Sequence, residues 1–241
     1  MRDRRPDRSF YRGYQTEMSI LTTLIQDLLT EARRKSRRNS LKRYAKLHQF
    51  IEKRLNEDLY PEFPDAGHTR VTHDVLERIN DRWSLRGKHV LDVGCGQGLA
   101  LEKLAEYGAV AKGLTFGEDF AECKRKGFDV FQMDMSFLEF PDETFDLIWA
   151  RHSLEHSLFP YFTLHVLFSA LKHGGVLYAE VPAPDTSARH QLNKNHYSCL
   201  TRTSWISLFK RVGFDIAEAF DIEVQLMCGP DTWYSFYLQK P

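Results

Sequence analysis

The stretch Val90-Leu91-Asp92-Val93-Gly94-Cys95-Gly96-Gln97-Gly98 runs from an apolar strand straight into three glycines that are spaced by two. Glycines after a strand let the backbone come close to a ligand, because no Cβ stands in the way. A dinucleotide site needs the pattern G-x-G-x-x-G, and Leu99 stands where that pattern has its third glycine. A P-loop needs Lys and Ser or Thr behind the glycines, and Leu99-Ala100 supplies neither. The stretch therefore predicts another kind of ligand site, or only a tight strand-to-helix turn.

Length and composition place the chain among globular proteins. Its 241 residues are enough for one α/β domain and an extension, and 42% of them are hydrophobic. No apolar run approaches the roughly 20 residues of a membrane span, and the N-terminus lacks the apolar stretch of a signal peptide. The four cysteines are scattered singly, which predicts neither a zinc site nor a disulfide framework. We therefore expect a cytoplasmic protein without a membrane partner.

A formal net charge of zero hides an uneven distribution of charge. Residues 1–54 hold 15 Lys and Arg against 6 Asp and Glu, which leaves 18 against 27 in the remainder. Such an asymmetry is typical of an arm that binds nucleic acid or an anionic surface. It is equally typical of a basic head that docks on an acidic body or on a partner subunit. The sequence leaves both interpretations open.

The chain is expected to divide near residue 65. Residues 1–65 are predicted to form a basic helical extension or cap, and residues 66–241 the main domain. Within the extension, residues 1–13 are charged and aperiodic, which indicates a tail. Two runs of apolar residues at helical spacing follow, separated by a predicted break over Arg33–Ser40. The proline-punctuated segment Tyr60–Gly67 is the expected linker.

From residue 66 onward, expected strands and helices alternate, which predicts an α/β fold with a parallel sheet covered on both faces. The strands are expected at 88–93, 109–114, 129–132, 145–150, 175–181, 214–226 and 233–238. The helices are expected at 70–82, 98–107, 118–126, 160–172 and 202–212. The last two strands are joined by a predicted turn, Gly229-Pro230-Asp231, so they must be antiparallel, since a parallel pair needs a long crossover.

Four further motifs follow the glycine stretch in order. They are Met133-Asp134-Met135, Phe140–Trp149, Arg151-His152-Ser153-Leu154-Glu155-His156 and Leu171-Lys172-His173-Gly174-Gly175-Val176-Leu177. With the glycine stretch, they resemble the motifs of class I S-adenosylmethionine (SAM)-dependent methyltransferases of the small-molecule type, over roughly residues 85–240. The resemblance implies a Rossmann-like seven-stranded, mostly parallel sheet with a C-terminal antiparallel hairpin, SAM as the cofactor, and methyl transfer as the activity.

The resemblance also implies which residues bind the cofactor. They are Asp92, Gly94, Gly96, Gly98, Thr115, Met133, Asp134, Met135 and Arg151. Asp92 and the glycines would lie beside the methionine portion of SAM, and Asp134 would bond the adenine amino group. Many members of the family end the second strand with an acidic residue that binds both ribose hydroxyls. Thr115 stands there in this chain, and its hydroxyl can still bond a ribose.

Methyl transfer from SAM requires an aligned acceptor and, where needed, a base that removes its proton. His152, after the fourth strand, and His196, on the long polar loop 182–198, are the expected catalytic residues, because histidine titrates near neutrality. His156 lies four residues beyond His152, a spacing that raises the question of a metal site. Glu155 alone is poor support for one, so no metal is expected.

The motifs typical of two nucleic-acid chemistries are missing. The fourth strand is not followed by the Asp/Asn-Pro-Pro-Tyr/Phe motif of adenine-N6 and cytosine-N4 enzymes, and no Pro-Cys pair supplies the nucleophile of 5-methylcytosine enzymes. The leading hypothesis is a SAM-dependent methyltransferase that acts on a hydroxyl or amine of a small molecule, glycan or metabolite. The alternatives are an RNA or other nucleic-acid methyltransferase that uses the basic N-terminal region, and a catalytically inactive binding subunit. The acceptor and the oligomeric state stay open.

Overall fold

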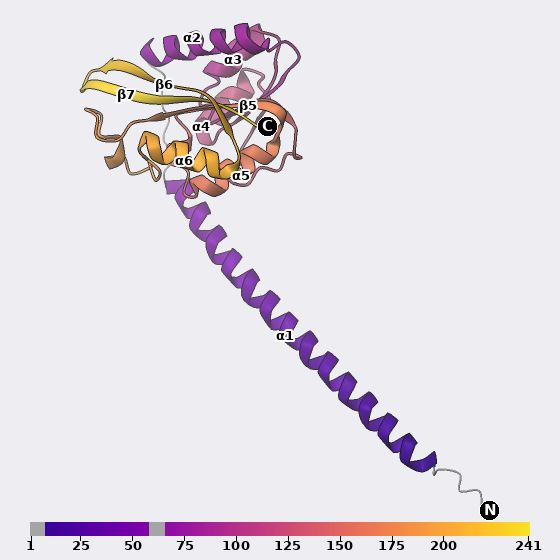
Figure 1. Ribbon diagram of the computed structural model, residues 1–241. Coiled ribbons are helices and arrows are strands. Elements are labelled where there is room, and N and C mark those ends of the chain that lie inside the picture. The colour runs from indigo at the N-terminus through magenta and orange to yellow at the C-terminus, as the bar shows by residue number, and fades with distance from the viewer. Residues whose placement is uncertain (1–7, 58–65) are drawn as a thin grey trace, which may run out of the picture. The chain divides into compact units, whose positions relative to one another are not determined.

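The computed structural model describes residues 8–57 and 66–241 (Figure 1). The chain separates into two compact units, one that ends at Glu57 and one that extends from Asp58 to Pro241. We describe each unit by itself. The expected domain boundary near residue 65, most of the expected linker and the first seven residues of the expected tail lie outside the described residues.

The second unit contains one sheet of seven strands in the order β3-β2-β1-β4-β5-β7-β6. The strands are β1 (His89–Val93), β2 (Val110–Leu114), β3 (Val130–Phe131), β4 (Phe145–Arg151), β5 (Leu171–Pro182), β6 (Asp215–Leu226) and β7 (Gly229–Gln239). The first five strands pair in parallel, and β7 pairs antiparallel with both β5 and β6. The predicted fold class is therefore confirmed, including the closing antiparallel hairpin.

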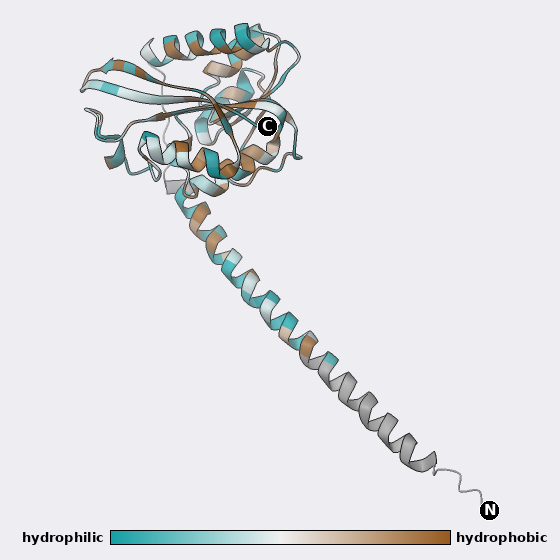
Figure 2. Ribbon diagram, in the orientation of Figure 1, coloured by the Kyte–Doolittle hydropathy of each residue, from teal (hydrophilic) through white to brown (hydrophobic). Residues whose placement is uncertain are grey.

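Helices cover both faces of this sheet, as Figure 1 shows. They are α2 (Ala66–Trp83), α3 (Leu99–Glu106), α4 (Gly117–Arg125), α5 (Pro160–Ala170) and α6 (Arg202–Val212), with short 3-10 turns η1 (Leu154–His156) and η2 (His190–Leu192). Alternate strand residues bury toward opposite faces, because successive side chains of a strand point to opposite sides. Leu177 joins the hydrophobic cluster under α5 and α6, whereas Tyr178 joins the cluster under α2, α3 and α4. In Figure 2, hydrophobic residues (brown) recur along the strands and helices of this unit.

The hairpin turn differs from its predicted position. Leu226 pairs with Gly229, so the two-residue turn is Met227-Cys228. Gly229, with φ of 128°, and the two residues after it belong to β7 rather than to a turn. Asp231 consequently lies inside the sheet, where it is 1% exposed.

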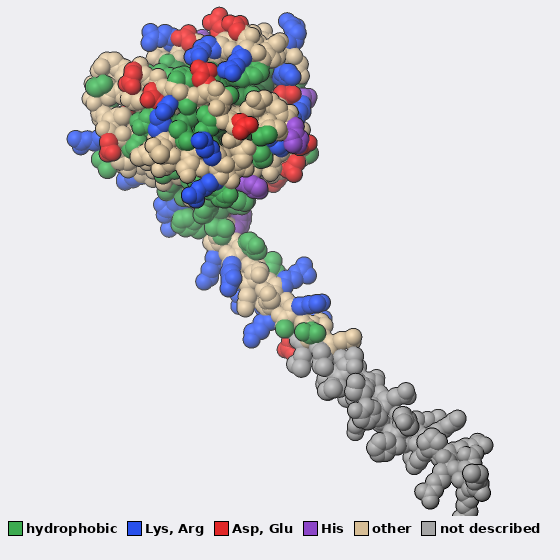
Figure 3. All heavy atoms as spheres, in the orientation of Figure 1, with side chains coloured by type: hydrophobic (Ala, Val, Ile, Leu, Met, Phe, Trp, Pro, Cys, Tyr) green, Lys and Arg blue, Asp and Glu red, His purple; other side chains and the backbone are tan. Residues whose placement is uncertain are grey.

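The first unit is a single helix, α1 (Arg8–Glu57). The expected break over Arg33–Ser40 is wrong, because this stretch contains no Gly or Pro to end a helix and its Arg and Lys residues are good helix formers. Residues 8–13, expected to lie in a tail, are helical too. Figure 3 shows basic side chains on the described part of α1, and all residues from Arg33 to Asn39 are exposed.

Two further observations concern the setting of the protein. Among the described residues, no helix combines the length and the apolar character that crossing a membrane requires. The four cysteine thiols are free, and those of Cys95 and Cys123 are buried. The cytoplasmic location inferred from cysteine usage stays a prediction.

Candidate active site

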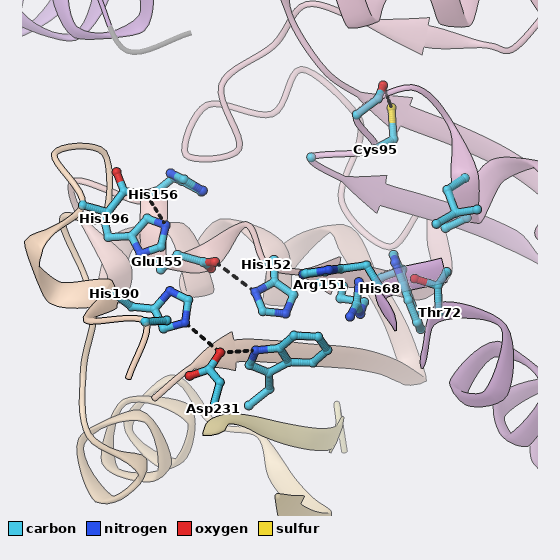
Figure 4. Close-up of a pocket in the computed structure, with 18 of the residues that line it drawn as sticks. His68, Thr72, Cys95, Arg151, His152, Glu155, His156, His190, His196 and Asp231 are labelled. Carbon is cyan, nitrogen blue, oxygen red and sulfur yellow. Dashed lines mark hydrogen bonds and ion pairs between the residues drawn. The ribbon is translucent and has the colours of Figure 1, made fainter. Parts of the chain in front are cut away.

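A cavity of about 650 Å³ opens where β1 and β4 end. This is the edge of a parallel sheet at which ligands bind in open α/β folds. One side of the cavity, which we call the glycine wall, is made by Asp92, Gly94, Cys95, Gly96, Gln97, Leu99, Ala100 and Asp119. Another side, which we call the histidine wall, is made by Arg151, His152, Glu155, His156, His190, His196, Asp231 and Trp233 (Figure 4).

The three glycines of the motif serve two different purposes. Gly94, Gly96 and Gly98 all have positive φ, at 77°, 50° and 91°, a region that side chains disfavour. A Cβ on Gly94 would stand 2.9 Å from the Cβ of Ser153, and one on Gly98 would stand 2.7 Å from the ring of Phe128. A Cβ on Gly96 would meet nothing within 4 Å. Gly94 and Gly96 line the cavity, whereas Gly98 starts α3 and allows it to pack.

Asp92 is a buried acid without a protein counter-charge. It lies near the end of β1 and is 2% exposed, and burial raises the pKa of its carboxyl well above the ordinary value, with the Cys123 thiol adding to the rise. Its Oδ2 has no hydrogen-bond partner among the described residues. A cationic group bound in the cavity would supply what this carboxylate lacks.

Five of the expected cofactor residues do not line the cavity: Gly98, described above, and Thr115, Met133, Asp134 and Met135. Thr115 is buried just after β2, where its backbone N–H donates to the carbonyl of Phe131 at 3.2 Å. Asp134 accepts a 2.7 Å hydrogen bond from the backbone N–H of Ser136, and Met133 and Met135 pack on the cluster under α5 and α6. Their contacts with SAM stay predictions. The acidic side chain that does line the cavity after β2 is Asp119, on the first turn of α4.

The side chain of Arg151 is held by a carboxylate of the protein. Its Nε lies 2.7 Å from Oε1 of Glu180, and its guanidinium stands 5.0 Å from the centre of the Trp233 ring. Glu180 is fully buried, and Tyr178 donates a hydrogen bond to it. Burial alone would raise the pKa of Glu180, but Arg151 and His152 more than offset this, so the pKa is lowered. The pair is thus a buried, charged anchor of the histidine wall.

His152 stands between two carboxylates. Its Nδ1 lies 3.5 Å from Oε1 of Glu155, and its Nε2 lies 3.2 Å from Oε1 of Glu180. Burial lowers its pKa, yet the two carboxylates raise it by more, and the net pKa lies above the ordinary value. Its backbone adopts a φ of 49°, which is uncommon for a residue with a side chain and frequent at functional sites. A raised pKa favours the protonated ring, which suits hydrogen-bond donation to these carboxylates better than proton abstraction.

The pKa of His196 is shifted in the opposite direction. Burial lowers its pKa to about 4, so its ring is neutral at pH 7. Its Nδ1 has no hydrogen-bond partner among the described residues, and its Nε2 lies 3.2 Å from Nδ2 of Asn193. The ring stacks on His190 with centroids 5.6 Å apart and meets His156 edge-on at 4.8 Å. The structure therefore brings the two expected catalytic histidines to one wall, with pKa values that are shifted in opposite directions.

Sequence reasoning missed a third histidine with a buried acid behind it. His190 Nε2 lies 2.9 Å from Oδ2 of Asp231, which also accepts a 2.8 Å hydrogen bond from Nε1 of Trp233. Burial would raise the pKa of Asp231, but the hydrogen bond from His190 helps to lower it to about 2. A carboxylate that orients a histidine in this way is the usual support of a general base. His190 was visible in the polar loop, but no local signal indicated that Asp231 would face it.

One further grouping spans η1 and the loop after η2. Glu155, His156 and His196 each offer one ligand atom, and these atoms all lie within 4.8 Å of one another. The sequence-based expectation of no metal considered only His152, His156 and Glu155. Figure 4 shows that the third member, His196, comes from a separate segment of the chain.

Comparison with known proteins agrees with the fold. A family model described as "Methyltransferase domain" matches residues 65–219. The ubiquinone biosynthesis O-methyltransferase of Coxiella burnetii is 33% identical over 124 residues, which are 47% of this chain and 53% of that protein. The protein of the same name from Nitrosococcus oceani is 28% identical over 163 residues, which are 63% of this chain and 61% of that protein. The matches thus span between half and two thirds of these relatives.

The likeness to solved structures extends over most of the second unit. A SAM-dependent methyltransferase from Archaeoglobus fulgidus superposes with a TM-score of 0.60 at 19% identity. The match covers 71% of this chain and 94% of that chain. At this level of identity the likeness shows a shared fold, and the chemistry must be argued from the cavity.

Proposed function

Because this chain belongs to the methyltransferase-domain family, we propose that it transfers a methyl group from SAM to a hydroxyl group of a small molecule. The family is shown by the match over residues 65–219, which confirms the resemblance of the sequence motifs. The observation that carries the finer proposal is the opposition of a glycine wall and a histidine wall across one cavity. The names of the two relatives, both O-methyltransferases, favour a hydroxyl over an amine as the acceptor.

In this proposal the glycine wall holds the methyl donor. The backbone of Gly94 and Gly96 would hold the methionine portion of SAM, because no Cβ stands in the way. The buried carboxylate of Asp92 would gain a positive charge from the ammonium group of that portion. Asp119 would bind the ribose, in place of the acidic residue that is missing at the end of β2.

The histidine wall holds the acceptor. Nε2 of His190 donates to Asp231, so Nδ1 is the ring nitrogen that takes the proton of the acceptor hydroxyl. The acceptor oxygen forms a bond to the methyl carbon as the bond from that carbon to sulfur breaks. The electron pair of that bond would stay on sulfur, so the donor without its methyl group would leave as a neutral thioether. His152, whose two ring nitrogens lie against Glu155 and Glu180, positions these carboxylates beside the acceptor.

Calorimetric titration of the full chain with SAM is the direct test. We expect saturable binding that is lost in Gly96→Arg, because the arginine side chain would fill the open space of the cavity beside this residue. Gly127→Arg is the matched control, since Gly127 also has a positive φ and open space but lies outside the cavity wall. Absence of SAM binding by the native chain would overturn the proposal and revive the inactive-subunit alternative.

The exposed basic side chains of α1 keep RNA as a second candidate acceptor. Contacts between basic side chains and phosphates weaken steeply as salt rises. We would offer labelled SAM with separate pools of metabolites and RNA, using the full chain and a variant that lacks residues 1–57. Methylation of metabolites by both proteins supports the small-molecule proposal. Methylation of RNA alone, lost with α1 and at high salt, would replace it.

A further inference from the structure

Glu155, His156 and His196 form a three-sided set of metal-ligating side chains within the histidine wall. One ligand atom from each residue lies within 4.8 Å of the other two. Atoms that bind one tetrahedral zinc ion at about 2.0–2.2 Å lie roughly 3.3–3.6 Å apart. A pair at the 4.8 Å limit would therefore have to close by roughly 1.2–1.5 Å, which rotation of the side chains can accomplish.

We propose that these three residues bind one divalent cation of the zinc class, and that the cation holds the oxygen of the acceptor. The proposal deepens the proposed function and rests on it for the identity of the acceptor. The binding of the cation itself depends only on the three side chains.

Two of the three ligand residues carry buried polar atoms that the described protein does not satisfy. Oε2 of Glu155 and Nδ1 of His196 are buried and have no hydrogen-bond partner among the described residues. Glu155 is 1% exposed, so solvent does not provide the missing partner readily. A buried polar atom without a partner costs free energy, on the order of 1–3 kcal/mol for a neutral group and more for a charged one. A cation between the two atoms would remove both penalties.

Each ligand residue is also held from behind. Nδ1 of His156 lies 3.0 Å from the carbonyl oxygen of Asn195, and Nε2 of His196 lies 3.2 Å from Nδ2 of Asn193. The other carboxylate oxygen of Glu155 lies 3.5 Å from Nδ1 of His152. Histidines that ligate metals almost always donate their second ring N–H to an acceptor. His156 does so to the carbonyl of Asn195, whereas Nε2 of His196 accepts from the amide of Asn193. The site therefore has supporting contacts as well as ligands.

The ligand types indicate the class of metal. Two imidazole nitrogens and one carboxylate oxygen form the three-ligand set of many catalytic zinc sites, which leave a fourth position open. Magnesium prefers oxygen ligands and keeps several waters, so it should bind here more weakly than zinc or cobalt.

The open position faces the cavity in which the acceptor is proposed to lie. A hydroxyl bound to the cation becomes more acidic, as a metal-bound water does. Its proton passes to His190, whose ring stacks on the His196 ring at 5.6 Å. The oxygen that remains attacks the methyl carbon of SAM, with the sulfur leaving group as described above. The cation thereby makes the acceptor hydroxyl more acidic, and His190 receives its proton.

Metal titration of the full chain, after removal of bound metal with a chelator, tests the proposal. We expect one saturable site for Zn²⁺, and one for Co²⁺ with the visible absorption of a low-coordinate cobalt ion. His196→Ala and Glu155→Gln should each weaken binding about 100-fold or more, since even loss of an outer partner typically costs 10–100-fold. His165→Ala, which removes an exposed histidine on α5, is the matched control and should bind as the native chain does.

The outcomes separate this inference from the proposed function. Failure to bind Zn²⁺ or Co²⁺, or equal binding by His196→Ala, would overturn the metal site, as would a preference for Mg²⁺ over Zn²⁺. Circular dichroism checks the fold of each variant, and His196→Ala decides the question if Glu155→Gln does not fold. SAM binding is measured in parallel. A chain that binds the metal but not SAM contradicts only the proposed function, and one that binds SAM but not the metal contradicts only this inference.

Discussion

The glycine wall and the histidine wall face one cavity, but the chain builds them in different ways. The glycine wall comes almost entirely from residues 92–100 and offers backbone, together with a buried acid that forms no ion pair among the described residues. The histidine wall comes from the end of β4, η1, the loop around η2 and the start of β7, and each of its acids lies beside a histidine. The first wall offers one acid to a cationic ligand, whereas the second combines its acids with histidines.

The largest expected difference between the walls concerns their buried acids. Glu180→Ala should lower the free energy of unfolding by about 3–5 kcal/mol, because it leaves Arg151 and His152 as buried charges without their carboxylate. Asp92→Asn should instead leave the stability unchanged or raise it by about 1 kcal/mol, measured by urea unfolding at pH 7. A carboxyl whose pKa is higher in the folded than in the unfolded protein lowers the free energy of unfolding at any pH where it must ionise. Equal losses in the two variants would abolish the distinction.

The next prediction concerns the backbone of the glycine wall. Gly94→Ala should weaken SAM binding roughly 100-fold, because its Cβ would meet that of Ser153 at 2.9 Å and overpacking costs about 1–3 kcal/mol. Gly127→Ala shares the positive φ but meets nothing within 4 Å, so it should bind SAM normally and lose only about 1 kcal/mol of stability. Calorimetry with SAM compares the two variants. Normal SAM binding by Gly94→Ala would mean that the close approach to Ser153 is unimportant.

The third prediction concerns how the contribution of Asp231, in the histidine wall, to stability depends on pH. The pKa of Asp231 is about 2 in the folded protein, below its ordinary value of 3.8. The contribution of Asp231 to the free energy of unfolding is therefore fully present above pH 3.8 and is lost as the pH falls through 2. Asp231→Asn should cost about 1 kcal/mol of stability at pH 6, and this difference should shrink toward pH 2. Urea unfolding as a function of pH provides the measurement, and a difference that does not change with pH would contradict the assigned ion pair.

The smallest effect on SAM binding is expected for Asp119, the one residue of the glycine wall that lies outside residues 92–100. Asp119→Ala should raise the dissociation constant for SAM about five-fold, as expected for a lost hydrogen bond worth about 1 kcal/mol. Glu118→Ala is the matched control, because this neighbour is exposed and does not line the cavity. If the two variants bind SAM equally well, Asp119 does not replace the acidic residue that is missing at Thr115.

The same comparison explains what the sequence could and could not predict. The glycine wall is a contiguous stretch in which strand, turn and glycines follow one another, so Gly94 and Gly96 could be assigned from sequence alone. Strands such as β1, β4 and β5 were predictable for a similar reason, since each contains a local run of apolar residues. The pairing of His190 with Asp231 was not, because the two lie 41 residues apart and Asp231 was assigned to a turn. Because the hairpin turn was predicted at Gly229-Pro230-Asp231 instead of Met227-Cys228, Asp231 was not considered as a partner of His190.

The error in α1 has another cause. The charged stretch Arg33–Ser40 suggested a break, but charge alone does not end a helix when Gly and Pro are missing. Thr115 and Asp134 were assigned through the family resemblance and do not line the cavity, so their contacts with SAM stay predictions. For Asp134, a local hydrogen bond to Ser136 already accounts for one carboxylate oxygen. Residues that shape a loop and residues that touch a ligand can look alike in a sequence.

The place of β7 in the sheet has a consequence for biosynthesis. This strand follows every other strand in chain order, yet it lies between β5 and β6. A ribosome therefore releases the glycine wall long before it releases the strand that carries Asp231 and Trp233. Until then the edge of β5 has no neighbour on that side, and unpaired edges of nascent domains are prone to pair with other chains. We expect the nascent protein to be most dependent on chaperones during this interval, when its donor side is complete and its acceptor side still lacks Asp231 and Trp233.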